Sequence, residues 1–198
     1  PKDVILNVLG KIRADGAVYK AIDFTGSYID ALDIPGRMTI CNMAVEMGAK
    51  TAYMQPNQAV LDYVSPRAVR PYEVVTTDPD FVYAESHLFN VSEMEPVVSC
   101  PNDVDNVHPI SEVAAQNIPL NQAYIGSCTN GRTEDLGQAA AILKGKHIPP
   151  YARLLVVPAS RDVLRESMEK GYIQTLIDAG ATLVTPGCAA CLGTHEGL

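Results

Sequence analysis

The second half of the chain alternates short apolar runs with amphipathic segments at a regular spacing. The apolar runs predict strands, and the segments with a period near 3.6 residues predict helices. Strands are expected over residues 123–127, 153–157 and 182–185, and helices over 134–143 and 162–179. Such alternation predicts an α/β fold with a parallel sheet and right-handed crossovers. In such a sheet, ligands collect beyond the carboxyl ends of the strands.

The first half is less regular. Pro35 suits the first turn of a helix that continues to about Met47, and Gly48 ends it. The other expected elements are helices over 3–14 and 59–64, strands over 18–24 and 51–54, and one or two extended strands within 81–99. A turn-rich stretch over 101–106 precedes the regular half. We therefore expect two α/β subdomains, 1–112 and 113–198, from a chain that is a piece of a longer protein.

Three cysteines are the candidates for chemistry. Cys128 lies in the motif GSCTNGR, and Cys188 and Cys191 form a C-x-x-C motif 188 − 128 = 60 positions later. Each motif follows a predicted strand, so the three thiols are expected at one edge of the sheet. Three thiolates are one ligand short of a closed metal site or cubane cluster. An iron left without a protein ligand could bind substrate as a Lewis acid.

The cysteine pattern alone leaves other sites possible. A C-x-x-C motif is also typical of a thioredoxin-like redox pair. The pair could equally be half of a zinc site that Cys128 and His195 complete. The remaining cysteines, Cys41 and Cys100, are interpreted as inert buried thiols.

The composition and net charge exclude some classes of function. With 47% hydrophobic and 19% charged residues, the chain is typical of a soluble globular protein, and no apolar run is long enough to span a membrane. A net charge of −8 argues against nucleic-acid binding, which requires a basic surface. Five cysteines, an odd number at uneven spacing, favour a reducing compartment with metal-bound thiolates over a disulfide framework. A cytoplasmic location is expected.

Three segments together resemble the signatures of the aconitase superfamily: IGSCTNGRTEDL at 125–136, GCAACLGTHEG at 187–197 and TICNMAVEMGA at 39–49. Within it, the chain is similar to large subunits of the 3-isopropylmalate dehydratase and homoaconitase type, of which it would cover about half. The resemblance implies a three-layer α/β/α iron–sulfur domain with the cluster ligands at the carboxyl ends of strands. It also implies a [4Fe-4S] cluster on Cys128, Cys188 and Cys191 with one open iron.

The activity implied by the resemblance is that of a hydro-lyase. Such an enzyme isomerises a hydroxy-dicarboxylate or hydroxy-tricarboxylate by dehydration and rehydration, here as 3-isopropylmalate dehydratase in leucine biosynthesis. Homoaconitase or an aconitase-like hydratase is an alternative within the class, and a non-catalytic Fe–S or zinc-binding domain is one outside it. A small subunit with a swivelling domain supplies a catalytic serine in this family, so this chain alone is expected to be inactive.

The resemblance also suggests roles for four other residues. Asn42 and Glu46, four apart on one helix face, would lie at the open iron, where a carboxylate can accept or return a proton. Ser127 and Asn130 could donate hydrogen bonds to cluster sulfurs, although Asn130 could equally serve only the turn.

Two further positions concern the local backbone. The family commonly carries Gly-Pro between the paired cysteines, and this chain has Ala-Ala there, which leaves the coordination intact but alters the backbone. Ser160 is expected to cap a helix.

Overall fold

The structure of the protein is a computed structural model that describes residues 1–193. The chain divides into two compact units, Pro1–Gln116 and Asn117–Leu198, and each is described by itself. Helices and parallel strands make up both units, which confirms the predicted α/β class. In the described part of the chain, no helix is long and apolar enough to cross a membrane.

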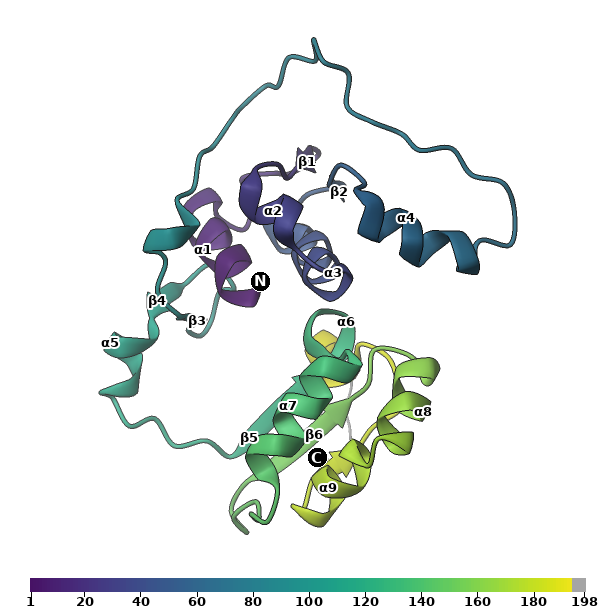
Figure 1. Ribbon diagram of the computed structural model, residues 1–198. Coiled ribbons are helices and arrows are strands. Elements are labelled where there is room, and N and C mark those ends of the chain that lie inside the picture. Colours follow the sequence, from purple (N-terminus) through teal and green to yellow (C-terminus); the bar gives the residue numbers. More distant parts are fainter. Residues whose placement is uncertain (194–198) are drawn as a thin grey trace. The chain divides into compact units, whose positions relative to one another are not determined.

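The N-terminal unit contains two small sheets (Figure 1). Strands β1 (Ala21–Asp23) and β2 (Thr51–Tyr53) pair in parallel, and β3 (Val97–Ser99) and β4 (Val107–Pro109) pair antiparallel. Its α-helices are α1 (Lys2–Ile12), α2 (Ser27–Ala31), α3 (Ile34–Met43), α4 (Gln58–Val64) and α5 (Ile110–Ala114). Three 3₁₀ turns complete it: η1 (Ala44–Met47), η2 (Ser65–Arg67) and η3 (Val91–Glu93).

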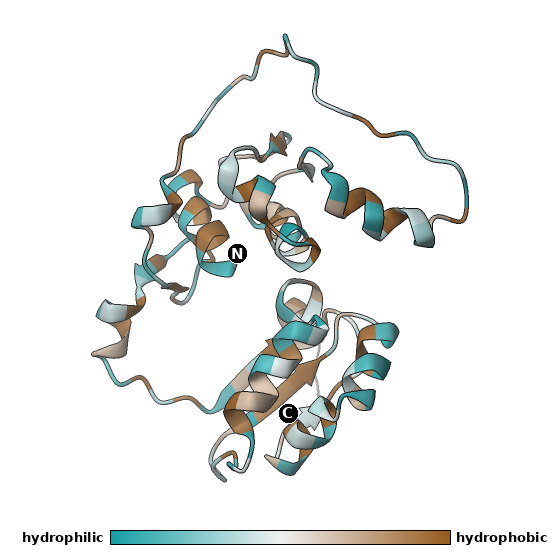
Figure 2. Ribbon diagram, in the orientation of Figure 1, coloured by the Kyte–Doolittle hydropathy of each residue, from teal (hydrophilic) through white to brown (hydrophobic). Residues whose placement is uncertain are grey.

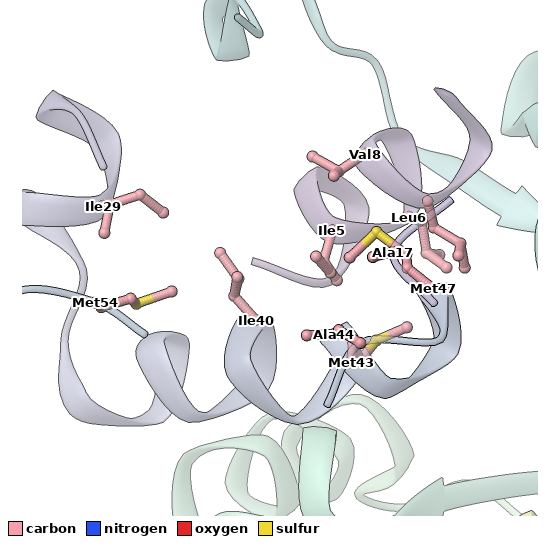
Figure 3. Packing of buried hydrophobic residues seen from close by; sticks show 12 residues of the cluster. Ile5, Leu6, Val8, Ala17, Ile29, Ile40, Met43, Ala44, Met47 and Met54 are labelled. Atoms are coloured by element: carbon pink, nitrogen blue, oxygen red, sulfur yellow. The ribbon is translucent and has the colours of Figure 1, made fainter. Parts of the chain in front are cut away.

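The apolar face of α1 and the buried side of α3 and η1 form the core of this unit (Figure 3). Local signals position α3: the Asp33 carboxylate accepts a hydrogen bond from the Gly36 amide at 2.8 Å, and Pro35 occupies the first turn. The buried members of the core are Ile5, Leu6, Val8, Leu9, Ala17, Ile29, Ile40, Met43, Ala44, Met47, Ala49 and Met54.

The prediction of extended strands within 81–99 is wrong for most of that range. Only Val97–Ser99 forms a strand, and residues 68–90 run as an extended trace with neither helix nor strand (Figure 1). The apolar residues that produced the alternating pattern are exposed, for example Val82 at 86%. A strand needs a neighbour to satisfy its backbone hydrogen bonds, and this segment pairs with none in the described structure.

The C-terminal unit is a three-stranded parallel sheet with the order β5-β6-β7. Its strands are β5 (Gln122–Gly126), β6 (Arg153–Val157) and β7 (Thr182–Leu183). Its helices are α6 (Ser127–Asn130), α7 (Thr133–Leu143), α8 (Arg161–Glu169) and α9 (Tyr172–Asp178), followed by the 3₁₀ turn η4 (Ala189–Leu192). The parallel sheet and the three strands were predicted, and β6 has the predicted bounds.

Consecutive strand order and right-handed crossovers bring α7, α8 and α9 to the same face of this sheet. Alternate residues of β6 therefore face different surroundings. Leu154 and Val156 pack with α7 and α9, whereas Leu155 and Val157 pack on the other side. Figure 2 shows β6 as hydrophobic and α8 as mostly hydrophilic, in keeping with a buried central strand and an exposed helix. The described helices thus form one layer on this sheet.

The predicted helix over 162–179 is two helices in the structure. Gly171 adopts the left-handed conformation with φ 74° between α8 and α9. A residue in this conformation ends a helix, and glycine adopts it without steric cost. The hydrophobic periodicity continues across the break because both helices contribute to the same cluster, with Val163 and Leu164 from α8 and Leu176 from α9.

Candidate cluster-binding site

The first cysteine motif is a tight turn at the carboxyl end of β5. Gly126 has φ 130°, and a Cβ on it would lie 1.9 Å from the Val157 carbonyl oxygen, so only glycine fits there. The next residue, Ser127, is buried and also has a positive φ of 66°. This backbone turns sharply at the end of the strand and leaves Cys128 exposed.

A carboxylate orders the end of this turn. The Asp135 side chain accepts hydrogen bonds from the Arg132 amide at 3.0 Å and from the Asn130 side-chain amide at 3.1 Å. The Arg132 guanidinium donates to the Cys128 carbonyl oxygen at 3.4 Å. Asn130 therefore has a structural role in starting α7, which is one of the two roles considered from the sequence.

The second cysteine motif follows β7 and forms η4. The Cys191 amide donates to the Cys188 carbonyl oxygen at 3.0 Å, and Cys188 and Cys191 are both exposed. Ala189 has a positive φ of 47°, at the position where the family commonly carries glycine. Ala189 and Ala190 pack against the face of the sheet that the helices leave free, on Leu155, Val157 and Val184.

Tyr124 joins the two motifs, and sequence analysis did not single it out. Its hydroxyl donates to the Cys188 carbonyl oxygen at 2.9 Å. Burial raises the pKa of Tyr124 above its ordinary value of 10.0, a hydrogen bond from Ser127 lowers it, and the charges of Cys191, Cys188 and Cys128 each raise it. A strand tyrosine directly before a cysteine turn was the only signal in the sequence.

The three cysteines of the two motifs are exposed, on turns that follow strands of one parallel sheet. Within residues 1–193, no three His, Cys, Asp or Glu side chains are grouped closely enough to hold one metal ion. A [4Fe-4S] cluster would take its three protein ligands from thiols on these two turns.

Asn42 and Glu46 belong to the N-terminal unit. The predicted helical segment from Pro35 to Met47 is present and Gly48 ends it, but only its first part is an α-helix, because the chain tightens after Met43 into the 3₁₀ turn η1. Asn42 is exposed and Glu46 half-buried.

Arg37 anchors this helix. Its buried guanidinium donates to the carbonyl oxygens of Ile29, Leu32 and Gln55 at 3.0–3.3 Å. These hydrogen bonds satisfy the buried cation through backbone dipoles, and they tie α3 to the segments on either side of it.

The other sequence expectations have simple outcomes. Ser160 caps α8, as predicted: its hydroxyl accepts a hydrogen bond from the Val163 amide at 3.2 Å. Cys41 and Cys100 are half-buried, and burial raises the pKa of the Cys41 thiol while the Arg37 charge lowers it. His195 lies outside the described residues.

The fold and the two cysteine turns define an α/β domain that presents thiols at the carboxyl edge of a parallel sheet. The chain belongs to the aconitase family (aconitate hydratase), whose family model matches residues 1–198.

Curated relatives are similar over the whole chain. A probable methanogen homoaconitase large subunit of Methanothermobacter thermautotrophicus is 49% identical over 100% of this chain and 46% of its own length. A probable 3-isopropylmalate dehydratase large subunit of the same organism is 46% identical, over 100% of this chain and 46% of its own length. The 3-isopropylmalate dehydratase large subunit of Heliobacterium modesticaldum is 45% identical with the same coverage. The chain spans about half the length of these relatives.

Proposed function

We propose that the chain is the cluster-carrying part of the large subunit of a [4Fe-4S] hydro-lyase of the 3-isopropylmalate dehydratase type, acting in leucine biosynthesis. The observation that carries this proposal is that three exposed thiols lie on two turns, each following a strand of one parallel sheet, and that the Tyr124 hydroxyl hydrogen-bonds to the backbone of the second turn. The names of the relatives support it.

Cys128, Cys188 and Cys191 would hold the cluster as thiolates. When bound, the cluster supplies an iron without a protein ligand, a Lewis acid that polarises the hydroxyl of a hydroxy acid. Ser127 and Asn130 would orient the Cys128 turn: the buried Ser127 turns the backbone through its positive φ, and the Asn130 side-chain amide donates to Asp135. Either residue could also donate to a cluster sulfur, because a hydroxyl and an amide both carry N–H or O–H groups suited to that role.

Glu46 and Asn42 are proposed to act on the substrate. The Glu46 carboxylate would accept and return the proton that dehydration and rehydration move, and the Asn42 amide would hydrogen-bond to a substrate oxygen. Their partial exposure leaves both side chains accessible to a ligand.

The proposal includes a partner. The relatives are named large subunits, so a small subunit would complete the enzyme and supply the catalytic serine. The 198-residue chain alone is then expected to be inactive, and isomerisation of substrate by this chain without a partner would contradict the assignment. The cytoplasmic location remains a prediction.

Homoaconitase is the second candidate. Two of the similar relatives, 49% and 46% identical, are named as methanogen homoaconitase large subunits. Both enzymes would use the same three thiols, so the choice between them rests on the substrate. Turnover of 3-isopropylmalate and of homoaconitate by the enzyme assembled with its small subunit would decide it.

The test of the cluster is anaerobic iron–sulfur reconstitution followed by electron paramagnetic resonance. The wild type is expected to form a cluster that readily loses one iron and gives a three-iron signal. Cys128→Ala, Cys188→Ala and Cys191→Ala should each abolish it. Cys100→Ala is the matched control, because this half-buried cysteine lies in the other unit.

Three results would count against the proposal. Uptake of zinc alone would indicate a structural metal site. A cluster that survives Cys128→Ala would leave the C-x-x-C motif as a local redox or structural feature. Discovery of a fourth cysteine ligand would instead favour an electron carrier, since a closed cluster has no iron free for substrate.

A further inference from the structure

The Tyr124 hydroxyl connects the first strand of the sheet to the second cysteine turn. It donates a hydrogen bond to the Cys188 carbonyl oxygen at 2.9 Å, across 64 positions of sequence. Tyr124 lies in β5, the strand that leads directly into the Cys128 turn. This hydrogen bond therefore links the strand that carries the first cysteine turn to the backbone of the second.

The second turn has a strained backbone. Ala189 adopts a left-handed conformation that favours glycine, so the turn is held in a conformation with a steric cost. Within η4, the Cys191 amide donates to the Cys188 carbonyl oxygen, and the Gly193 amide donates to the carbonyl oxygens of Ala189 and Ala190. The methyl groups of Ala189 and Ala190 pack on the sheet.

We propose that Tyr124 is a positioning residue that ties the Cys128 turn to the Cys188–Cys191 turn and so sets the spacing of the three thiols before a cluster binds. This inference adds a positioning residue to the proposed site. It rests on the proposed function only for the assumption that the bound group is a [4Fe-4S] cluster. The tyrosine ring packs on the same face of the sheet as Ala189 and Ala190, which places its hydroxyl level with the second turn. The tether thus helps to hold a turn in which Ala189 adopts a left-handed backbone.

The first arm of the test uses the metal-free, reduced chain and Tyr124→Phe, which removes only the hydroxyl. Amide hydrogen exchange at Cys191 and Gly193 is expected to accelerate by roughly two- to tenfold, the range for losing one hydrogen bond. Tyr151→Phe is the matched control, because this tyrosine is 72% exposed and lies in the same unit. Ile173→Val controls for general destabilisation, since it removes one methylene group from the helix-covered core.

The second arm measures iron retention after anaerobic reconstitution. The rate at which the three-iron signal appears on mild oxidation should rise in Tyr124→Phe and stay at the wild-type rate in both controls. Unchanged exchange in Tyr124→Phe, or an equal change in Ile173→Val, would overturn the tether. If the wild type binds no cluster while Tyr124→Phe still frees the second turn, the tether stands and the hydro-lyase assignment fails. If the cluster forms and Tyr124→Phe changes neither measurement, the tether fails and the assignment stands.

Discussion

One strand of the C-terminal unit and one segment of the N-terminal unit differ in the burial of their apolar residues. In β6, the four consecutive residues from Leu154 to Val157 are at most 3% exposed because both faces of this strand are covered. Within the segment 68–90, Val69 and Leu88 are 98% and 100% exposed. The same kind of residue stabilises the sheet at one place, whereas Val69 and Leu88 contribute almost no buried area at the other.

This difference shows that an apolar run becomes a strand only when neighbouring strands are available. β6 has a parallel partner on each side, so its backbone groups are satisfied within the sheet. Residues 68–90 pair with no strand in the described structure. The units also differ in chemistry: the cysteine turns belong to the sheet-based unit, and Asn42 and Glu46 to the other. Four predictions test this contrast.

The largest effect, a loss of turnover, is expected from Glu46→Gln. This substitution tests whether Glu46 acts in catalysis without affecting cluster binding. Turnover by the assembled enzyme should fall about 10²- to 10⁴-fold, because the amide cannot accept a proton. Cluster content, measured by iron analysis and electron paramagnetic resonance, should match the wild type. Glu93→Gln, at an exposed carboxylate of the same unit, is the control. Loss of the cluster in Glu46→Gln would contradict this division of labour.

Truncation of a core side chain should destabilise mainly the unit that contains it. Leu176→Ala and Ile40→Ala each truncate a side chain that is 1% exposed, one in each unit. Each should destabilise its own unit by about 2–5 kcal/mol, through lost burial and the cavity left behind. Amide hydrogen exchange of both units in both variants measures this. Equal loss of protection in the two units would mean that they unfold together.

A smaller effect is expected in the exposed segment. Leu88→Ser should change the free energy of unfolding of the 198-residue chain by less than about 0.5 kcal/mol, because the side chain is 100% exposed. Urea denaturation measures the difference. A loss comparable to that of Ile40→Ala would show that this segment packs onto the N-terminal core.

The smallest effect is expected for Glu166 in the C-terminal unit, where the contribution of its carboxylate to the free energy of unfolding should depend on pH. The Lys170 ammonium at 2.7 Å, followed by the Thr133 hydroxyl at 2.9 Å, lowers the pKa of Glu166 from its ordinary value of 4.5. The unfolded chain therefore binds more protons as the solution is acidified, so this contribution is present above pH 4.5 and is lost as the pH falls through the lowered pKa.

Glu166→Gln removes the contribution, so its urea midpoint should lie slightly below that of the wild type at neutral pH. The two midpoints should converge in acid. A gap that persists at low pH would mean that the glutamate acts by packing and not by charge. Because this carboxylate is solvent-exposed, salt should also narrow the gap.

The secondary-structure elements and the candidate site differ in how much of each could be predicted from the sequence. The bounds of β6 and, to within one residue, of β5 and α7 follow from local periodicity and turn residues. The division at Gly171 was missed because both helices bury the same stripe of the periodic pattern. Strands expected within 81–99 were wrong because alternation does not reveal whether a pairing strand exists.

At the candidate site, the motifs identified the three cysteines because their flanking residues are distinctive. Tyr124 was missed because an aromatic residue in a strand is ordinary, and its hydrogen-bond partner is 64 positions away. The change from α-helix to 3₁₀ turn beneath Asn42 and Glu46 was missed too, since Gly48 marks where the helical segment stops but not how it tightens before stopping.

The sequence by itself determined the α/β class, the parallel sheet and the chemical nature of the cysteine-bearing turns. These depend on interactions between residues close along the chain: periodicity, capping and turn geometry. Only the tertiary structure decided which face of β6 each side chain meets, where the helices break, and that one phenol links two turns. Those outcomes depend on which segments, distant along the chain, become neighbours once the strands have paired. A local sequence pattern does not specify these long-range contacts.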